Sequence, residues 1–152
     1  MTFEDHYEIE RLIYKYPELT DTGDFDGVGR LFAHCAQARP NGEIRPAVGA
    51  ETYAKHYAGI VRRYPDSGTP KTRHVVSNVA IELDGAPDRA KARSYFTVLQ
   101  QTAELPLQVI CSGTYFDKFA KVDGEWRFVE RGEDIELQGD FTTKLINLLQ
   151  GG

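Results

Sequence analysis

The sequence predicts an α+β fold in which helices pack on the concave side of a curved antiparallel sheet that forms a cone. Two observations support this prediction. Apolar residues recur at helical spacing in the first part of the chain, and four long extended runs joined by short turns follow. A bent sheet that helices close only in part leaves a cavity with apolar walls, the usual shape of a small-molecule site.

The 152 residues are expected to form a single domain over residues 1–152, because this length suits one hydrophobic core. The apolar fraction of 41% and the charged fraction of 27% are typical of a soluble globular protein. A net charge of -5 and one basic doublet, Arg62-Arg63, predict no nucleic-acid partner, since phosphate binding needs a clustered basic face. The N-terminal segment is acidic and has no continuous apolar stretch, so we expect no signal peptide, no membrane partner and a cytoplasmic location.

Two short helices are predicted first. One runs from Phe3 to Leu19, and Pro17 is expected to kink or end it. Its apolar face consists of Ile9, Leu12, Ile13 and Tyr16. The segment Asp21-Thr22-Gly23-Asp24 then predicts a turn, and Asp24 can cap a second helix that carries Val28, Leu31 and Phe32.

A small hairpin and a third helix are expected next. The hairpin pairs residues 35–39 with residues 44–48 around the turn Pro40-Asn41-Gly42. A helix follows, carries the Arg62-Arg63 doublet as a solvated face, and stops at Pro65. Its aromatic stripe is interpreted as core rather than as a cofactor site, and the stripe consists of Tyr53, Tyr57, Ile60, Val61 and Tyr64.

Four extended runs, over residues 72–83, 89–101, 107–122 and 125–137, predict an antiparallel meander. The turns between them are short, and residues 140–149 are expected to form a closing amphipathic helix. Because helices cover only one side of such a sheet, its other face is free to pack against a second chain. We therefore expect a homo-oligomer, a dimer or a trimer.

His74 and Asp21 are the first candidates for chemistry. A histidine on a rigid strand beside an apolar cavity can take and return a proton near neutral pH, although a lone strand histidine can also be a hydrogen-bonded structural residue. A base of this kind needs an acceptor that holds its other ring nitrogen. Asp21 is either that acceptor or the aspartate of a local Asx turn.

Tyrosines give the predicted cavity amphipathic walls, and one phenol can donate a hydrogen bond to a substrate carbonyl as negative charge develops. Tyr16 and Tyr14 are the first candidates, and packing alone is the alternative for each. Further candidates for substrate contact are Tyr57, Tyr95, Tyr115 and Asn78, of which the last faces inward or outward according to strand register. Arg131 can stabilise a leaving group, or it can pair with Glu130, Glu133 or Asp134.

No metal or cofactor is expected. Cys35 and Cys111 lie far apart without a CxxC spacing and are interpreted as reduced, partly buried thiols. His34 and Cys35 are neighbours on an extended segment, so they point to opposite sides and cannot grip one ion together. The chain contains no motif for nucleotide, metal, flavin or haem.

Several segments in order resemble the SnoaL-like family of the nuclear transport factor 2-like superfamily. They are Ile9 to Tyr16, Asp21 to Asp26, Leu31-Phe32, Thr72-Arg73-His74 and Asp123 to Phe128. The resemblance covers nearly the whole chain and implies the α+β cone. For activity it is less specific, because that superfamily includes dehydratases, isomerases, cyclases and non-catalytic binding modules.

Within the superfamily the chain resembles two eliminating enzymes, scytalone dehydratase and hexachlorocyclohexane dehydrochlorinase. The resemblance implies that Asp21 orients His74 as a base and that Arg131 assists a departing group. The pattern departs from these enzymes at Tyr16, which replaces a lysine, and at Gln100 or a neighbour, which replaces a second histidine. The sequence thus favours a cofactor-independent lyase acting on a small hydrophobic or polycyclic molecule, with an isomerase, a cyclase or a non-catalytic binding module as alternatives.

Overall fold

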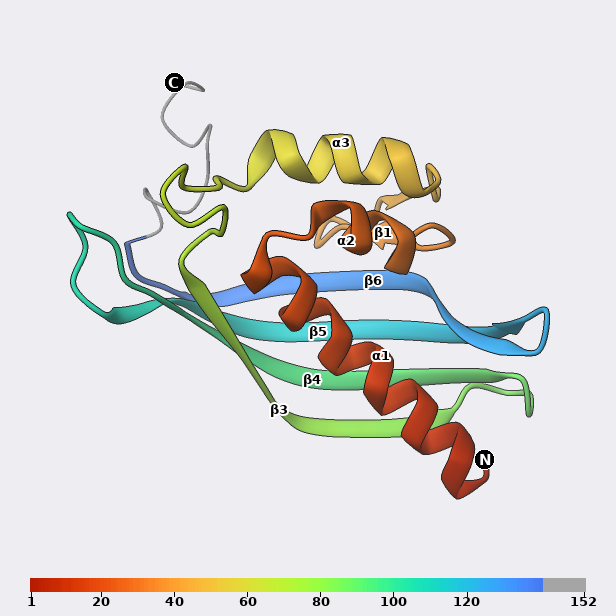
Figure 1. Ribbon diagram of the computed structural model, residues 1–152. Coiled ribbons are helices and arrows are strands. Elements are labelled where there is room, and N and C mark those ends of the chain that lie inside the picture. The colour runs from red at the N-terminus through yellow and green to blue at the C-terminus, as the bar shows by residue number, and fades with distance from the viewer. Residues whose placement is uncertain (141–152) are drawn as a thin grey trace.

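A computed structural model of the chain describes residues 1–140. Three helices cover one face of a six-stranded sheet, and the first helix crosses that face obliquely (Figure 1). The helices are α1 (Phe3–Thr22), α2 (Phe25–Leu31) and α3 (Ala50–Ile60). The strands are β1 (Ala36–Ala38), β2 (Ile44–Arg45), β3 (Thr72–Leu83), β4 (Arg89–Gln100), β5 (Gln108–Val122) and β6 (Glu125–Gln138). The predicted α+β architecture is confirmed, while the helix expected over residues 140–149 lies outside the described residues apart from its first position.

The sheet has the strand order β2-β1-β6-β5-β4-β3. The four long strands form the antiparallel meander that their short turns predict. Strand β1 adds to the edge of this meander in parallel with β6, and β2 pairs with β1 in antiparallel fashion. Register shifts interrupt all three long pairings, and each of these bulges bends the strand that carries it. The sheet therefore curves around the helices without closing into a barrel (Figure 1).

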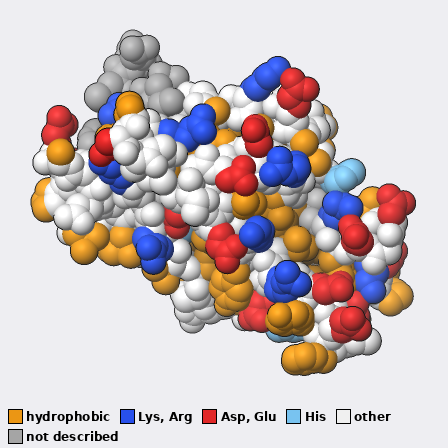
Figure 2. Space-filling model, in the orientation of Figure 1, with side chains coloured by type: hydrophobic (Ala, Val, Ile, Leu, Met, Phe, Trp, Pro, Cys, Tyr) orange, Lys and Arg blue, Asp and Glu red, His pale blue; other side chains and the backbone are white. Residues whose placement is uncertain are grey.

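Strand alternation separates the two faces of the sheet. Along β4 the side chains of Phe96, Val98 and Gln100 are buried, while Tyr95 is exposed and its neighbours on that face are at most half-buried. The largest fully buried apolar side chains lie between helices and sheet and include Phe32, Phe96, Tyr115, Phe119 and Phe128. On the surface, basic and acidic side chains are interspersed (Figure 2). Among residues 1–140, no helix is long and apolar enough to cross a membrane.

Pro17 was expected to kink or end the first helix, and it does not end it. Helix α1 continues for five further residues through Pro17 to Thr22, so Asp21 lies in its last turn rather than in a loop. A proline inside a helix removes one backbone hydrogen bond. Here the residues after it still pack, because Pro17 and Thr20 are buried against the core. The helix ends instead at Gly23, where the N–H groups of Gly23 and Asp24 bond back to the carbonyls of Thr20 and Leu19.

Two other predicted elements are longer than the observed ones. Helix α3 stops at Ile60, and the next residue, Val61, is buried in an extended conformation. The Arg62-Arg63 doublet therefore lies in a connection and not on a helix; Arg63 stacks on the Phe25 ring at 4.8 Å. Strand β2 ends at Arg45 because the next residue, Pro46, has no N–H for sheet pairing.

Candidate active site

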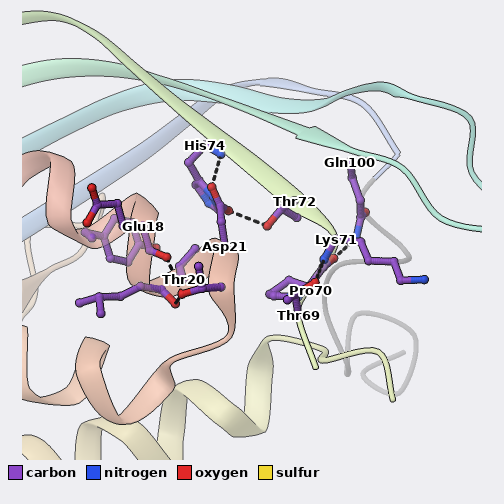
Figure 3. Close-up of polar contacts among 12 residues, drawn as sticks. Glu18, Thr20, Asp21, Thr69, Pro70, Lys71, Thr72, His74 and Gln100 are labelled. Carbon is purple, nitrogen blue, oxygen red and sulfur yellow. Dashed lines mark hydrogen bonds and ion pairs between the residues drawn. The ribbon is translucent and has the colours of Figure 1, made fainter. Parts of the chain in front are cut away.

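Asp21 and His74 meet where the end of α1 lies against the start of β3 (Figure 3). The Nδ1 atom of His74 lies 2.6 Å from Oδ1 of Asp21. The backbone N–H of His74 donates to the other carboxylate oxygen at 2.8 Å, and the hydroxyl of Thr72 donates to Oδ1 at 2.8 Å. Both oxygens of Asp21 are thus held by β3, and its carboxylate bonds to that strand rather than closing a local Asx turn.

The local backbone explains why these side chains converge. Thr72 and His74 are two residues apart on β3, so they project from the same face, and both are buried while Arg73 between them is exposed. Asp21 reaches that face because α1 continues past Pro17 and packs on β3. The left-handed backbone of Gly23, with φ of 79°, then turns the chain away from the strand.

Electrostatics favour a charged carboxylate and a fixed tautomer. Partial burial raises the pKa of Asp21, but the hydrogen bonds from the His74 ring and backbone and from Thr72 outweigh it and lower that pKa below its ordinary value. An ionised Asp21 only accepts hydrogen bonds, so the proton of a neutral imidazole resides on Nδ1. This tautomer leaves the lone pair on Nε2, as a histidine base requires.

A hydroxyl network adjoins this pair. The phenol oxygens of Tyr16 and Tyr57 lie 3.1 Å apart, and the Tyr57 hydroxyl also bonds to the hydroxyl of Thr20. The ring of Tyr16 stands edge-on to the His74 imidazole, with the ring centroids 6.0 Å apart. Burial raises the pKa of Tyr57 to about 12 and the pKa of Tyr16 well above its usual value. Both phenols therefore keep their protons near neutral pH and can donate hydrogen bonds.

Tyr16 and Tyr57 also form part of the wall of a cavity of about 560 Å³. The cavity lies between helices α1 and α3, the β1–β2 connection and strands β5 and β6. The other lining residues are Ala38, Arg39, Pro40, Ile60, Val61, Cys111, Glu133, Asp134 and Ile135. His74 is not among them, and its side chain is only 1% exposed. Tyr16 contacts the His74 ring and also lines the cavity.

Arg131 has a different partner from those expected. Its guanidinium binds both carboxylate oxygens of Asp117, at 2.7 and 2.8 Å, and both side chains are buried. The expected pairing with Glu130, Glu133 or Asp134 is wrong, because Asp117 lies directly opposite Arg131 in the β5–β6 register. Burial alone lowers the pKa of Arg131, but the carboxylate of Asp117 raises it above the ordinary value.

Aromatic rings enclose the Arg131 guanidinium, which stacks 4.0 Å from the ring centroid of Tyr115 and 4.8 Å from that of Tyr16. Arg131 does not line the cavity. It lies behind Tyr16 as a buried and already paired charge, so it contacts the candidate site only through that ring.

Three of the other candidate residues lie away from this group, and the fourth, Tyr115, lies in the core beside Tyr16. Tyr14 is exposed on α1, where it lines a separate cavity of about 550 Å³ that α1 forms with the β5–β6 turn. Tyr95 is exposed on the sheet face that the helices leave open. Asn78 is exposed at the β3 bulge, where its φ is 53°. Tyr115 is buried and stacks on Phe96 at a centroid distance of 4.3 Å, within the core rather than on the cavity wall.

Sequence reasoning missed three residues that the structure brings to the site, namely Thr20, Thr72 and Glu133. A signal existed for two of them. Thr72 precedes His74 by two positions on one strand, and Glu133 follows Arg131 by two, so each shares a face with a residue already singled out. Thr20 gave no such signal, because its partner Tyr57 lies on another helix.

Among the described residues, no group of three or more His, Cys, Asp or Glu side chains is arranged to hold a metal ion. Cys35 and Cys111 are both buried, and they are thiols rather than halves of a disulfide. Burial raises the pKa of the Cys35 thiol to about 12, so this thiol stays protonated.

The fold matches a known class of α+β proteins. The chain belongs to the SnoaL-like domain family, whose pattern it matches over residues 1–132. The resemblance inferred from the sequence is thereby confirmed.

Solved structures agree with this assignment. A candidate scytalone dehydratase from Novosphingobium aromaticivorans is 27% identical, with 91% of this chain and 88% of that chain covered and a TM-score of 0.69. A protein of unknown function from Mycobacterium tuberculosis is 25% identical, with 88% of this chain and 73% of that chain covered and a TM-score of 0.67. A nuclear transport factor 2-like protein with a cystatin-like fold from Novosphingobium aromaticivorans is similar in fold. It is 20% identical, with 92% of this chain and 86% of that chain covered and a TM-score of 0.69. No functionally curated protein matches the chain.

Proposed function

We propose that the protein is a cofactor-independent proton-transfer enzyme, a lyase that removes water from a small hydrophobic or polycyclic molecule bound in the cavity. The observation that carries the proposal is the engagement of Asp21 by the ring of His74, its backbone N–H and Thr72. A carboxylate held so firmly fixes both the tautomer and the orientation of the imidazole. The 27% identity to a candidate scytalone dehydratase supports dehydration as the reaction.

In this mechanism His74 Nε2 takes a proton from a carbon next to a substrate carbonyl. Asp21 stabilises the imidazolium that results. The electron pair of the C–H bond forms the enolate, and its collapse expels a hydroxyl from the neighbouring carbon. The imidazolium returns its proton to that hydroxyl, so water and an unsaturated ketone leave while the enzyme regains its starting protonation state.

The phenols of Tyr16 and Tyr57 supply the hydrogen bonds to the enolate oxygen. Their raised pKa values keep them protonated, and their hydroxyls lie together at the cavity wall. Donors placed where negative charge develops are commonly a large contribution to catalysis. Because His74 is buried behind Tyr16, the substrate must approach the imidazole past the Tyr16 ring.

An isomerase would use the same residues. If the substrate has no hydroxyl on the neighbouring carbon, the imidazolium returns its proton to another carbon, and the double bond moves. The substrate rather than the site distinguishes the two reactions.

The test is a panel of cyclic β-hydroxyketones, with the conjugated product followed by absorbance and α-proton exchange followed by NMR in D₂O. We expect His74→Gln and Asp21→Asn each to lower the rate by at least about a hundred-fold, the scale of general acid–base catalysis. His56→Gln makes the same change at an exposed histidine of α3 and should leave the rate unchanged. Full rates in both site variants would show that the pair is not the base.

A non-catalytic ligand-binding module is the second candidate function. It is favoured by the 1% exposure of the His74 side chain and by its absence from the cavity wall. Under this alternative, members of the panel bind the wild-type protein without any proton exchange, and Asp21→Asn leaves their affinities unchanged.

A further inference from the structure

The cavity presents different chemistry on its two sides. The helix side offers the phenols of Tyr16 and Tyr57 and the apolar side chains of Ile60 and Val61. The sheet side carries the carboxylates of Glu133 and Asp134. Neither carboxylate has a part in the proton-transfer step described above.

Glu133 points toward the helices. It lies opposite Tyr115 in the β5–β6 register and two residues after Arg131, and both of those side chains face the core. Its neighbour Asp134 lies opposite Thr114 in the same register and also borders the cavity. Glu133 is solvent-accessible, so a ligand that enters the cavity can reach it.

No cation of residues 1–140 neutralises Glu133 within ion-pair distance. Arg131, the cation two residues away, is already bound to Asp117 through two hydrogen bonds. Arg39 lines the same cavity from the β1–β2 connection, but it is exposed and forms no ion pair with Glu133. Within the described part of the chain, Glu133 is therefore a cavity carboxylate without an ion-pair partner.

The charge of Glu133 acts on the phenols. Burial is the main cause of the raised pKa of Tyr115, and Glu133 raises it further; Glu133 has the same effect on Tyr16 and Tyr57. A negative potential at these hydroxyls opposes an enolate beside them. A positive charge on the ligand, placed against Glu133, would cancel that potential.

We infer that Glu133 is a specificity residue and that the cavity selects ligands carrying a protonated amine on an aromatic or polycyclic body. The carboxylate accepts a charge-assisted hydrogen bond from the ammonium group, and nearby tyrosine rings offer faces that attract a cation. A ligand carboxylate is disfavoured because it meets a like charge. The inference rests on the proposed role of this cavity as the substrate site and names the class of its ligand.

The test compares three probes with one ring system: 2-(1-naphthyl)ethylamine, 2-(1-naphthyl)ethanol and 1-naphthylacetate. Their affinities are measured at pH 7 by isothermal titration calorimetry. We expect the wild-type protein to bind the amine about ten-fold more tightly than the alcohol, the scale of a charge-assisted hydrogen bond in a site open to water, and the acid most weakly. In Glu133→Gln, the amine and the alcohol should bind about equally, and the acid should bind more tightly than in the wild type.

Glu136→Gln is the matched control, because it makes the same change at an exposed carboxylate of β6 that does not line the cavity. It should preserve the preference for the amine. Equal affinities for amine and alcohol in the wild-type protein, a preference that survives Glu133→Gln, or failure of all three probes to bind would each overturn the inference. The readout is affinity, so a loss of turnover in His74→Gln tests the proton-transfer proposal separately.

Discussion

Thr20 and Tyr57 share a buried hydrogen bond next to the cavity. At the scale of single residues, we expect the loss of this bond to lower stability. Thr20 is 0% exposed, so its hydroxyl cannot turn to water if its partner is lost. Tyr57→Phe leaves that hydroxyl without this partner. We expect the free energy of unfolding to fall by about 1–3 kcal/mol, measured by urea denaturation.

Tyr53→Phe is the control for this change, because the Tyr53 ring stacks on Tyr57 while its hydroxyl forms no hydrogen bond with the described residues. It should alter stability by less than about 0.5 kcal/mol. The double variant Thr20→Val/Tyr57→Phe removes both polar groups and should lose less than the sum of the two single losses. Strictly additive losses would show that the two hydroxyls do not depend on each other.

Asp21 also sets a pH dependence of stability. Its pKa in the folded protein is lower than the ordinary value of 3.8, so the unfolded chain takes up the proton first as the pH falls. The stabilisation is therefore complete well above pH 3.8 and is lost as the pH falls through the folded-state pKa. We expect the Tm of the wild-type protein to drop on acidification below about pH 4, and Asp21→Asn to show a smaller drop in calorimetry.

The matched carboxylate is Asp66, which pairs with Lys71 at the surface. Water and salt screen that pair, so Asp66→Asn should change the fall of Tm at acidic pH less than Asp21→Asn does. An identical curve for the wild type and Asp21→Asn would contradict the hydrogen-bonded geometry at His74.

The residues of the site could be predicted from the sequence where the side-chain type alone indicates a chemical role, but their partners could not. His74, Asp21, Tyr16 and Tyr57 were singled out, and the structure brings these four together. Arg131 was also singled out, but its partner was not, because Asp117 lies on the neighbouring strand and comes opposite Arg131 only through the register shift between Lys118 and Phe119.

At the scale of a secondary-structure element, the end of α1 depends on Gly23. It ends α1 with φ of 79°, and a Cβ atom there would collide with the backbone carbonyl of Gly68. Gly23→Ala is therefore expected to destabilise the protein by about 1–3 kcal/mol or more, because backbone strain and a steric clash act together.

Gly124→Ala separates these two effects. Gly124 has a similar φ of 82° in the β5–β6 turn, but a Cβ atom would meet only open space. This control should lose less stability than Gly23→Ala in the same denaturation experiment. Equal losses would mean that the approach of Gly68 contributes nothing.

Elements with local signals were predicted well, and those that depend on tertiary contacts were not. The turn at Asp123-Gly124 has two left-handed residues, as a tight hairpin requires, and it joins β5 and β6 as expected. The persistence of α1 through Pro17 depends on burial of its last turn. The parallel pairing of β1 with β6 joins segments that are distant in the sequence, so no local pattern indicates it.

At the scale of the whole molecule, curvature and one-sided coverage together create the cavity. Bulges bend the sheet around the helices, while β1 and its connection to β2 extend the wall beyond β6. The same one-sided arrangement leaves the opposite sheet face without helices from residues 1–140 (Figure 1). The cavity and this open face are thus two consequences of one architecture.

The open face exposes apolar side chains on three neighbouring strands. Val75 on β3 is 46% exposed, Tyr95 on β4 is 46% exposed, and Phe116 on β5 is 51% exposed. Burying such a face against a second copy removes apolar surface from water. We therefore expect the protein to form a homo-oligomer in solution, with a mass of two or three chains in light scattering coupled to size-exclusion chromatography.

Phe116→Glu tests whether the open face is the contact, because it places a charge in the middle of the apolar patch. The variant should shift toward the single-chain mass, since burying an unpaired carboxylate is costly. Tyr7→Glu makes a comparable change at an aromatic residue of α1 that is also 51% exposed, and it should leave the mass unchanged. An oligomer that survives Phe116→Glu would have to use another surface, and a wild-type protein that stays single-chain at all concentrations would contradict the assembly itself.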